Sequence, residues 1–169
     1  TGTFDGNGHE ISGLYINSDD RWYAGLFSRI GSGGTVGTVK NLTLADSYIS
    51  GGTYVGGICG ANNGGSITSC SNNGTVNVNG GTYTYVGGIC GFNDGSITDG
   101  SLITTCSNSG TVTGSDGSTV GGICGYNYEG GTITTCYWLD STAGIDVGGV
   151  ACVRRICRDI QQLVQEYLR

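Results

Sequence analysis

Several residue types that most proteins use freely are scarce or absent in this sequence. Its 169 residues include no proline, no methionine, one lysine and one histidine, and only 12% are charged. The formal net charge is −6, so nucleic acid is not an expected partner, because binding phosphates requires clustered Lys and Arg side chains. No apolar run approaches the ~20 residues that cross a bilayer, and no membrane span is predicted.

No signal peptide is recognisable either. The chain opens on TGTFDGNGHEIS, where a repeating pattern is already under way. We therefore expect the sequence to be a fragment of a longer protein, whose targeting signals lie elsewhere.

Glycine is abundant instead, at 35 residues, and much of it belongs to a repeated hexapeptide. The letters VGGICG stand at residues 55–60, 86–91 and 120–125, with a variant beginning at Tyr23 and a shorter copy at Val147. Successive copies begin 32, 31, 34 and 27 residues apart. Each unit holds three short apolar stretches separated by Gly, Asn and Ser, which are strand and turn signals. Such a period indicates a repeat architecture.

These features predict an all-β fold: a right-handed parallel β-solenoid (β-helix) of about four to five coils over residues 1–149. Equivalent residues of successive coils are expected to stack ~4.8 Å apart. The glycine pairs are expected at bends, because glycine reaches positive φ without strain. Two positions of the unit repeat asparagine, and we expect these amides to bond one another from coil to coil: Asn62, Asn93 and Asn127 at one, Asn72 and Asn108 at the other.

Three stretches carry a resemblance to a known family. FDGNGHEISGLYI (4–16), VGGICGYN (120–127) and TITTCYWLDSTAG (132–144) resemble the GLUG-repeat proteins, over about residues 1–149. The resemblance implies a module of a large secreted or surface-attached bacterial protein, such as an adhesin, and an extracellular or cell-surface location. The family defines no catalytic residues, so none is carried over.

Six of the eight cysteines fall on two positions of the repeat: Cys59, Cys90 and Cys124 on one, Cys70, Cys106 and Cys136 on the other. Phe27 and Leu42 take these positions in an earlier coil, and we assign Phe4 and Leu14 to them in the first coil. Both positions are therefore expected to face the core.

Two interpretations of these cysteines stay open. The thiols either form buried ladders, since free cysteine behaves as a small hydrophobe, or pair within each coil. The even count in every coil favours disulfides, which would be Cys59–Cys70, Cys90–Cys106 and Cys124–Cys136. Cys152 and Cys157 lie outside the repeat register.

No pattern selects a catalytic or metal site. The chain has no CxxC pair and a single histidine, so a zinc site is not expected. His9 has no triad-like partner pattern, and the carboxylates are scattered beside glycines. We therefore predict no enzyme activity, no catalytic residue, no metal and no cofactor, and a carbohydrate-active β-helix enzyme is the least favoured alternative.

Aromatic residues give the only candidate binding surface. Trp22, Tyr54 and Tyr85 precede the repeated hydrophobic position, and Tyr83 is near in sequence. If Val55 points inward, Tyr54 points outward by strand alternation. An exposed row of rings suits stacking on sugars or contact with a surface protein, and these four residues are the candidate ligand contacts. The alternative is that the tyrosines stack only as structural support.

The last twenty residues, 150–169, differ from the rest of the chain. They contain no glycine, and their apolar residues recur at helical spacing. They include four arginines and only two acidic residues. We predict an amphipathic α-helix that caps the open end of the solenoid or docks to a partner.

The predicted function is non-enzymatic: an extracellular repeat module of a bacterial surface protein, acting in adhesion or as a rigid stalk. A glycan or a surface protein is the expected partner. The alternative is a structural protein that self-associates through the solenoid end or the C-terminal helix.

Overall fold

The structure is a computed structural model that describes residues 2–32, 34–79, 83–95, 100–139 and 157–159. The regular secondary structure of this part consists of β-strands alone. All pairings between the named strands are parallel. The strands form four sheets, which we call A to D.

The bounds of the strands, sheet by sheet, are as follows. Sheet A contains β1 (Gly2–Asp5), β2 (Glu10–Ser12), β6 (Gly37–Ala45), β10 (Ser66–Asn72), β14 (Leu102–Thr104), β15 (Ser107–Asn108), β19 (Thr132–Thr134), β20 (Cys136–Trp138) and β21 (Cys157–Asp159). Sheet B contains β3 (Tyr15–Asn17), β7 (Tyr48–Gly51), β11 (Thr75–Val78) and β16 (Val112–Thr113). Sheet C contains β4 (Tyr23–Ala24), β8 (Tyr54–Gly56), β12 (Tyr85–Gly87) and β17 (Thr119–Gly121). Sheet D contains β5 (Phe27–Ile30), β9 (Cys59–Asn63), β13 (Cys90–Asp94) and β18 (Cys124–Tyr128).

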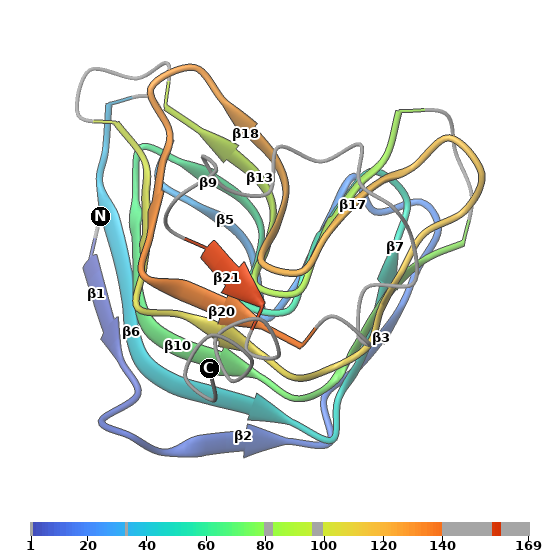
Figure 1. Ribbon diagram of the computed structural model, residues 1–169, viewed down its shortest axis with the longest axis horizontal. Helices are drawn as coiled ribbons and strands as arrows, with labels where there is room; N and C mark the ends of the chain where they lie inside the picture. Colours follow the sequence, from blue (N-terminus) through green and yellow to red (C-terminus); the bar gives the residue numbers. More distant parts are fainter. Residues whose placement is uncertain (1, 33, 80–82, 96–99, 140–156, 160–169) are drawn as a thin grey trace, which may run out of the picture.

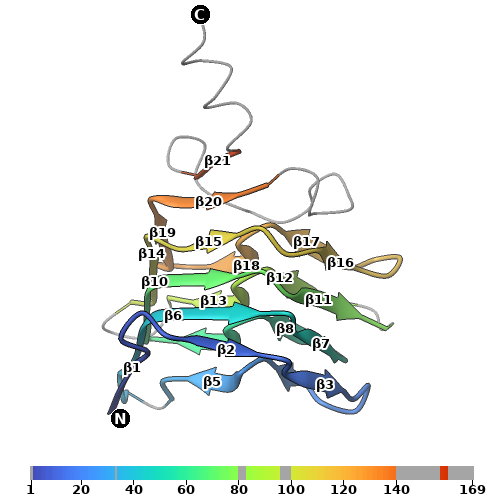
Figure 2. The ribbon, with the colours of Figure 1, turned by 90° about the horizontal axis from the view of Figure 1, so that it is seen from below.

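The chain passes through sheets A, B, C and D in turn and then begins the next layer, as the stacked ribbons in Figure 2 show. Four coils are formed in this way, β1–β5, β6–β9, β10–β13 and β14–β18, and sheet A continues with β19, β20 and β21. The parallel β-solenoid is therefore confirmed, with about four coils. Each coil has four sides, one more than the three apolar stretches of each repeat suggest. The hand of the coil stays a prediction.

The repeated hydrophobic residues form continuous inner columns. Val55, Val86 and Val120 are in register on sheet C, and Ala24 takes the same position in the first coil. These side chains are 0–7% exposed and belong to one core cluster that runs through all the coils. Apolar burial on every coil explains why stacking is favourable, because a single coil cannot cover its own apolar face.

The glycines of VGGICG allow two sheets to approach closely. Seen along the coil axis, sheets C and D turn inward toward each other (Figure 1). A Cβ on Gly91 would lie 2.5 Å from the backbone nitrogen of Val55 and 2.7 Å from the carbonyl oxygen of Gly60. Gly56 and Gly57 are likewise crowded by backbone or buried side-chain atoms, and neither is among the residues with positive φ. The expected reason, positive φ, is therefore wrong for this motif, which needs glycine for space.

The predicted amide ladders are confirmed. Asn62 donates to Asn93 Oδ1 at 2.9 Å, and Asn93 donates to Asn127 Oδ1 at 2.7 Å. In the second ladder Asn72 donates to Asn108 Oδ1 at 2.9 Å. The amides also bond nearby glycine carbonyls, so the ladders hold both successive coils and the turn of each coil.

From the second coil onward, each layer of sheet A bends at one position where the backbone is left-handed. Asn41, Ser69, Thr105 and Thr135 occupy this bend with φ between 53° and 54°. Asparagine tolerates this region, but β-branched threonine rarely adopts it, so the two threonines carry backbone strain.

The first coil departs from the register that its sequence suggests. Phe4 pairs with Val39 on sheet A and does not lie in the sheet D column of Phe27 and Cys59. The centroids of the Phe4 and Phe27 rings are nevertheless only 5.3 Å apart. Leu14 lies beside Ser47, to whose hydroxyl its backbone N–H donates at 3.1 Å, and not at the Leu42 position. Both assignments were wrong because the turns before residue 37 lack the repeated letters that align the later coils.

The predicted helix over 150–169 lies mostly outside the described residues. The three residues of it that are described, Cys157–Asp159, form β21 and pair with β20. At these positions the helix prediction is wrong. Because Cys157 pairs with Cys136, its backbone also follows the repeat register from which we had excluded it.

Candidate functional site

The outer faces of sheets C and D carry a group of packed rings that we call the aromatic cluster: Tyr23, Tyr54, Tyr85, Phe92, Tyr126 and Tyr128. Tyr23, Tyr54 and Tyr85 are in register on sheet C, with ring centroids 5.1 and 5.6 Å apart. From sheet D, Phe92 lies 5.2 Å from Tyr54, and Tyr126 lies 4.9 Å from Tyr85. Rings of the two sheets therefore pack together across the inward angle of the coil.

Two of the four candidate contact residues belong to this cluster. Tyr54 and Tyr85 are half-buried by their ring neighbours. Trp22 is one residue out of the column, because Tyr23 is the residue that pairs with Tyr54. Trp22 and Tyr83 are 69% and 76% exposed. Stacked, half-buried rings agree with the alternative in which the tyrosines support the fold.

The chemistry of the aromatic cluster follows from this packing. The guanidinium of Arg29 lies 4.3 Å from the ring centroid of Tyr23, which is cation–π geometry. Burial raises the pKa of Tyr54, and the nearby hydroxyls of Tyr23 and Tyr85 raise it further, so the phenol stays neutral. Since neighbouring rings cover much of the ring faces, the cluster presents mainly edges and hydroxyl groups to a partner.

A second aromatic pair, which the sequence analysis missed, lies on sheet B. Tyr15 stacks on Tyr48 with ring centroids 5.4 Å apart. Beside it is a hollow of about 430 Å³ that we call the Tyr15 hollow, lined by Tyr15, Ile16, Asn17, Ser18 and Arg21. The signal was present in the sequence, because Tyr-Ile recurs at 15–16 and 48–49, but these letters are not part of the repeated hexapeptide.

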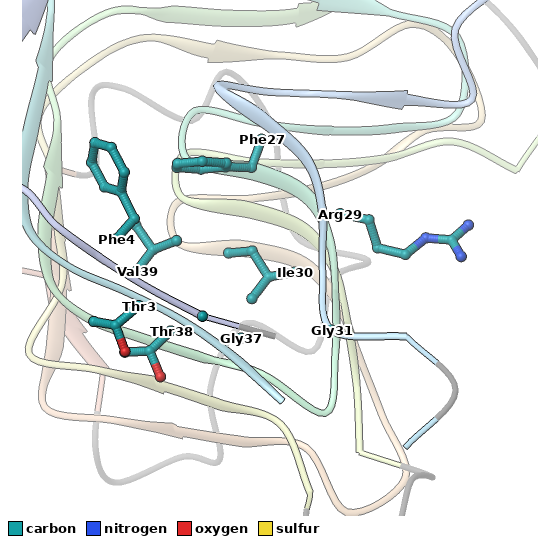
Figure 3. A pocket seen from close by; sticks show the side chains of 10 residues that line it. Thr3, Phe4, Phe27, Arg29, Ile30, Gly31, Gly37, Thr38 and Val39 are labelled. Carbon is teal, nitrogen blue, oxygen red and sulfur yellow. The ribbon is translucent and has the colours of Figure 1, made fainter. Parts of the chain in front are cut away.

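Among the described residues, no strand covers the outer side of the first coil. A cavity of about 340 Å³ lies between β1, β5 and the start of β6, with Phe4, Phe27, Ile30 and Val39 as its apolar lining (Figure 3). Phe4 is 41% exposed. In the described part of the chain, the strands of this coil in sheets B, C and D pair on one side only. Apolar surface and unpaired strand edges together suit a further strand or coil as partner.

The six repeat cysteines are free thiols, so the predicted disulfides Cys59–Cys70, Cys90–Cys106 and Cys124–Cys136 are not supported. One set lies along sheet D and the other along sheet A, and each thiol neighbours the equivalent thiol of the next coil. Cys59 and Cys90, for example, have their sulfurs 3.5 Å apart, well beyond a bonded distance.

Burial makes two of the sheet D thiols, Cys90 and Cys124, poor nucleophiles. It raises the pKa of Cys90 and of Cys124 well above the ordinary value, so almost no thiolate is present at neutral pH. This agrees with the buried-ladder interpretation and with the phenylalanine, Phe27, that pairs with Cys59.

Charged groups do not converge on a site in the described part of the chain. Asp5 forms an ion pair with Lys40 at 3.2 Å, and a hydrogen bond from Asn41 is the main reason why its pKa is lowered. Among the described residues, no three His, Cys, Asp or Glu side chains are grouped to hold a metal. That part also contains no helix with the length and apolarity to traverse a bilayer.

Residues 51–77 match the family model of the GLUG motif. The chain therefore carries a GLUG motif at residues 51–77. The matched segment starts at the end of β7 and runs through β8, β9 and β10 to β11, which is almost one full coil. The resemblance to GLUG-repeat proteins is thereby confirmed, and one GLUG unit corresponds to about one turn of the solenoid.

Two curated relatives match shorter parts of the chain. Halomucin from Haloquadratum walsbyi is 40% identical over 79 residues, which are 47% of this chain and 1% of halomucin. A putative Gly-rich membrane protein from Evansella cellulosilytica is 45% identical over 49 residues, which are 29% of this chain and 5% of that protein. The chain therefore corresponds to a small fraction of the relatives that it matches. No solved structure matches it significantly.

Proposed function

We propose that this chain is a rigid, non-enzymatic repeat module of an extracellular surface protein, and that it serves as a stalk. The GLUG motif and the two relatives, one of them a putative membrane protein, support a repeat module of a surface protein. The stalk role rests on one observation: aliphatic, amide, thiol and aromatic side chains all stack in register from coil to coil.

Stacking of this kind resists bending and sliding. Each coil is bonded to the next by backbone hydrogen bonds in four sheets. Moving one coil relative to the next would separate Asn62 from Asn93 and Tyr54 from Tyr85 at the same time. All these contacts would be lost together, so a partly bent stack would keep none of them to stabilise it. The coils are therefore expected to move as one rigid unit.

Single-molecule force spectroscopy on the chain, held by its two ends, tests this proposal. We expect distinct force peaks, with contour length released in multiples of one coil, on the order of 10 nm for ~30 residues at ~3.4 Å each. Smooth extension at low force, without peaks, would contradict a stalk that resists force.

Contact with a glycan or a surface protein is the finer part of this proposal. Trp22 and Tyr83 offer exposed rings, whereas Tyr54 and Tyr85 offer hydroxyl groups at the edge of the aromatic cluster. Tyr54→Phe with Tyr85→Phe removes only the hydroxyls and keeps the stacking, and Trp22→Ala with Tyr83→Ala removes the exposed rings. Binding to a glycan array or to cell surfaces that neither pair changes would exclude these residues as contacts.

Self-association through the first coil is a second candidate, favoured by the open cavity at Phe4 and Phe27. A second copy would cover this apolar lining and pair with β3, β4 and β5, which have one partner each among the described residues. Light scattering over a hundredfold concentration range is expected to show dimers that Phe4→Asp dissociates. A wild-type monomer at every concentration would end this candidate.

A further inference from the structure

Four tyrosines form a stack that runs through all four coils, and we call it the tyrosine column: Tyr23, Tyr54, Tyr85 and Tyr126. The ring centroids of successive members are 5.1, 5.6 and 4.9 Å apart, and their planes differ by 18–30°. One member comes from each coil. All four are half-buried, so neighbouring groups hold them in place while part of each side chain stays open to solvent.

The column keeps its phenol groups where it passes from one sheet to another. On sheet C the position after Tyr85 is taken by Thr119, which has no ring. The next member, Tyr126, comes instead from sheet D, where the equivalent residue one coil earlier is Phe92. Packing does not require the hydroxyl, since Phe92 stacks on Tyr126 without one. What successive coils share is a phenol beside a phenol, which is the arrangement that oxidative coupling requires.

The chain offers an oxidant few other targets. It contains no methionine, and the six repeat cysteines are buried. Burial also raises the pKa of Cys90 and of Cys124, so little reactive thiolate forms there. Trp22, at 69% exposure, is the main competing side chain among the described residues. A one-electron oxidant in solution therefore acts largely on aromatic rings.

We propose that the tyrosine column is a site of oxidative cross-linking, at which hydrogen peroxide and a haem peroxidase join neighbouring rings of successive coils as dityrosine. Each of two phenols loses one electron and one proton, and the peroxide is reduced to two water molecules. The unpaired electron of each radical is shared with the ring carbons beside the C–OH carbon. A bond forms between one such carbon of each ring, and the hydrogen on each of them moves to the phenolic oxygen. Two ring C–H bonds and the peroxide O–O bond are thereby exchanged for one C–C bond and two water O–H bonds.

The fold decides which tyrosines couple. Groups that are held next to each other react as though each were present at a very high local concentration. Tyr83 is more exposed, at 76%, but no described ring packs against it, so its radical has to meet a second molecule. In a dilute solution coupling within the column is therefore favoured. This coupling does not depend on the stalk role, since force resistance and cross-linking are measured separately and either can fail alone.

Treatment of the dilute wild-type chain with a haem peroxidase and hydrogen peroxide tests the site, after accessible thiols have been blocked with iodoacetamide. Dityrosine fluorescence of the monomer fraction reports the coupling, and mass spectrometry of peptic peptides identifies the joined residues. We expect linked peptides that join neighbouring members of the column, such as Tyr54 with Tyr85.

Two double variants remove the same number of phenols and keep every ring. Tyr54→Phe with Tyr126→Phe leaves Tyr23 and Tyr85, which are not neighbours, and linked column peptides should fall about tenfold or more. Tyr23→Phe with Tyr126→Phe is the matched control, because it keeps Tyr54 and Tyr85, whose rings are 5.6 Å apart. The link between these two should stay within about threefold of wild type. The melting temperature of each variant confirms that it is folded.

Three results overturn the proposal. The first is that the folded wild-type chain forms no linked peptide between members of the column. The second is that the variant without the Tyr54 and Tyr126 phenols forms as much column linkage as the control while both are folded. The third is that links from Tyr83 outnumber those within the column, since exposure rather than stacking would then decide which tyrosines couple.

Discussion

Replacing Asn93 by alanine tests how much the buried amide ladder contributes to stability. Asn93 is fully buried, accepts a hydrogen bond from Asn62 at 2.9 Å and donates one to Asn127 at 2.7 Å. Each lost bond costs about 1 kcal/mol net, and leaving the Asn127 carbonyl without its donor adds about 1 kcal/mol. We expect the free energy of unfolding to fall by about 3 kcal/mol.

Urea unfolding in reducing buffer, followed by circular dichroism, measures this loss. For a domain of this size, ~3 kcal/mol corresponds to a melting temperature lowered by about 10 °C. The control is Asn73→Ala, because the side chain of Asn73 is exposed and, among the described residues, accepts a hydrogen bond only from the surface serine Ser109. That variant should lose less than about 0.5 kcal/mol. If both variants lost the same stability, the ladder would be incidental to the fold, and our reasoning would be wrong.

Three further substitutions probe the ladder end, the bend and the hexapeptide. Ile30→Asn is expected to be nearly neutral, because its amide would donate to Asn62 Oδ1, which is buried without a partner, and so offset the lost apolar burial. Thr105→Gly should stabilise the fold by up to about 1 kcal/mol, because it relieves a φ of 54°. Gly91→Ala should cost about 3 kcal/mol or more, because its Cβ would press on the fixed backbone of sheet C. Chemical denaturation measures all three.

Each of these substitutions has a matched control. Val39→Asn buries an amide where no ladder continues, and it should clearly lower the free energy of unfolding, unlike Ile30→Asn. Thr104→Gly, one residue before the bend, should destabilise by about 1 kcal/mol. Gly37→Ala should cost under about 1 kcal/mol, because its nearest neighbour is a side-chain methyl of Ile30 at 3.2 Å. If a control changed the free energy of unfolding as much as its test variant does, the structural explanation given for that test variant would be wrong.

The repeat allowed much of the fold to be predicted from the sequence. Copies of VGGICG align without ambiguity, so the columns at Val55 and the amide ladder at Asn62 follow from strand stacking alone. The burial of the cysteines followed in the same way, because Phe27 takes the place of Cys59.

What the sequence did not predict depends on contacts between different sides of the coil. Whether Cys59 bonds Cys70 depends on how sheets A and D face each other, and their spacing in the sequence carries no information on that. The crowding around Gly91 likewise arises between β13 and the backbone of β8. The hydrogen bond from Asn79 to Asn17 likewise joins the third coil to the first, across 62 residues of sequence.

If the coils form one rigid stack, the distance between two residues near the ends of sheet A has a single value that can be measured directly. Thr3 and Thr132 are surface residues in the same column, four interstrand steps apart. At ~4.8 Å per step their Cα atoms should be about 19 Å apart. Spin labels on unnatural amino acids at these positions should give a single narrow distance distribution by double electron–electron resonance. A broad distribution, or one centred far beyond this separation, would contradict the rigid solenoid.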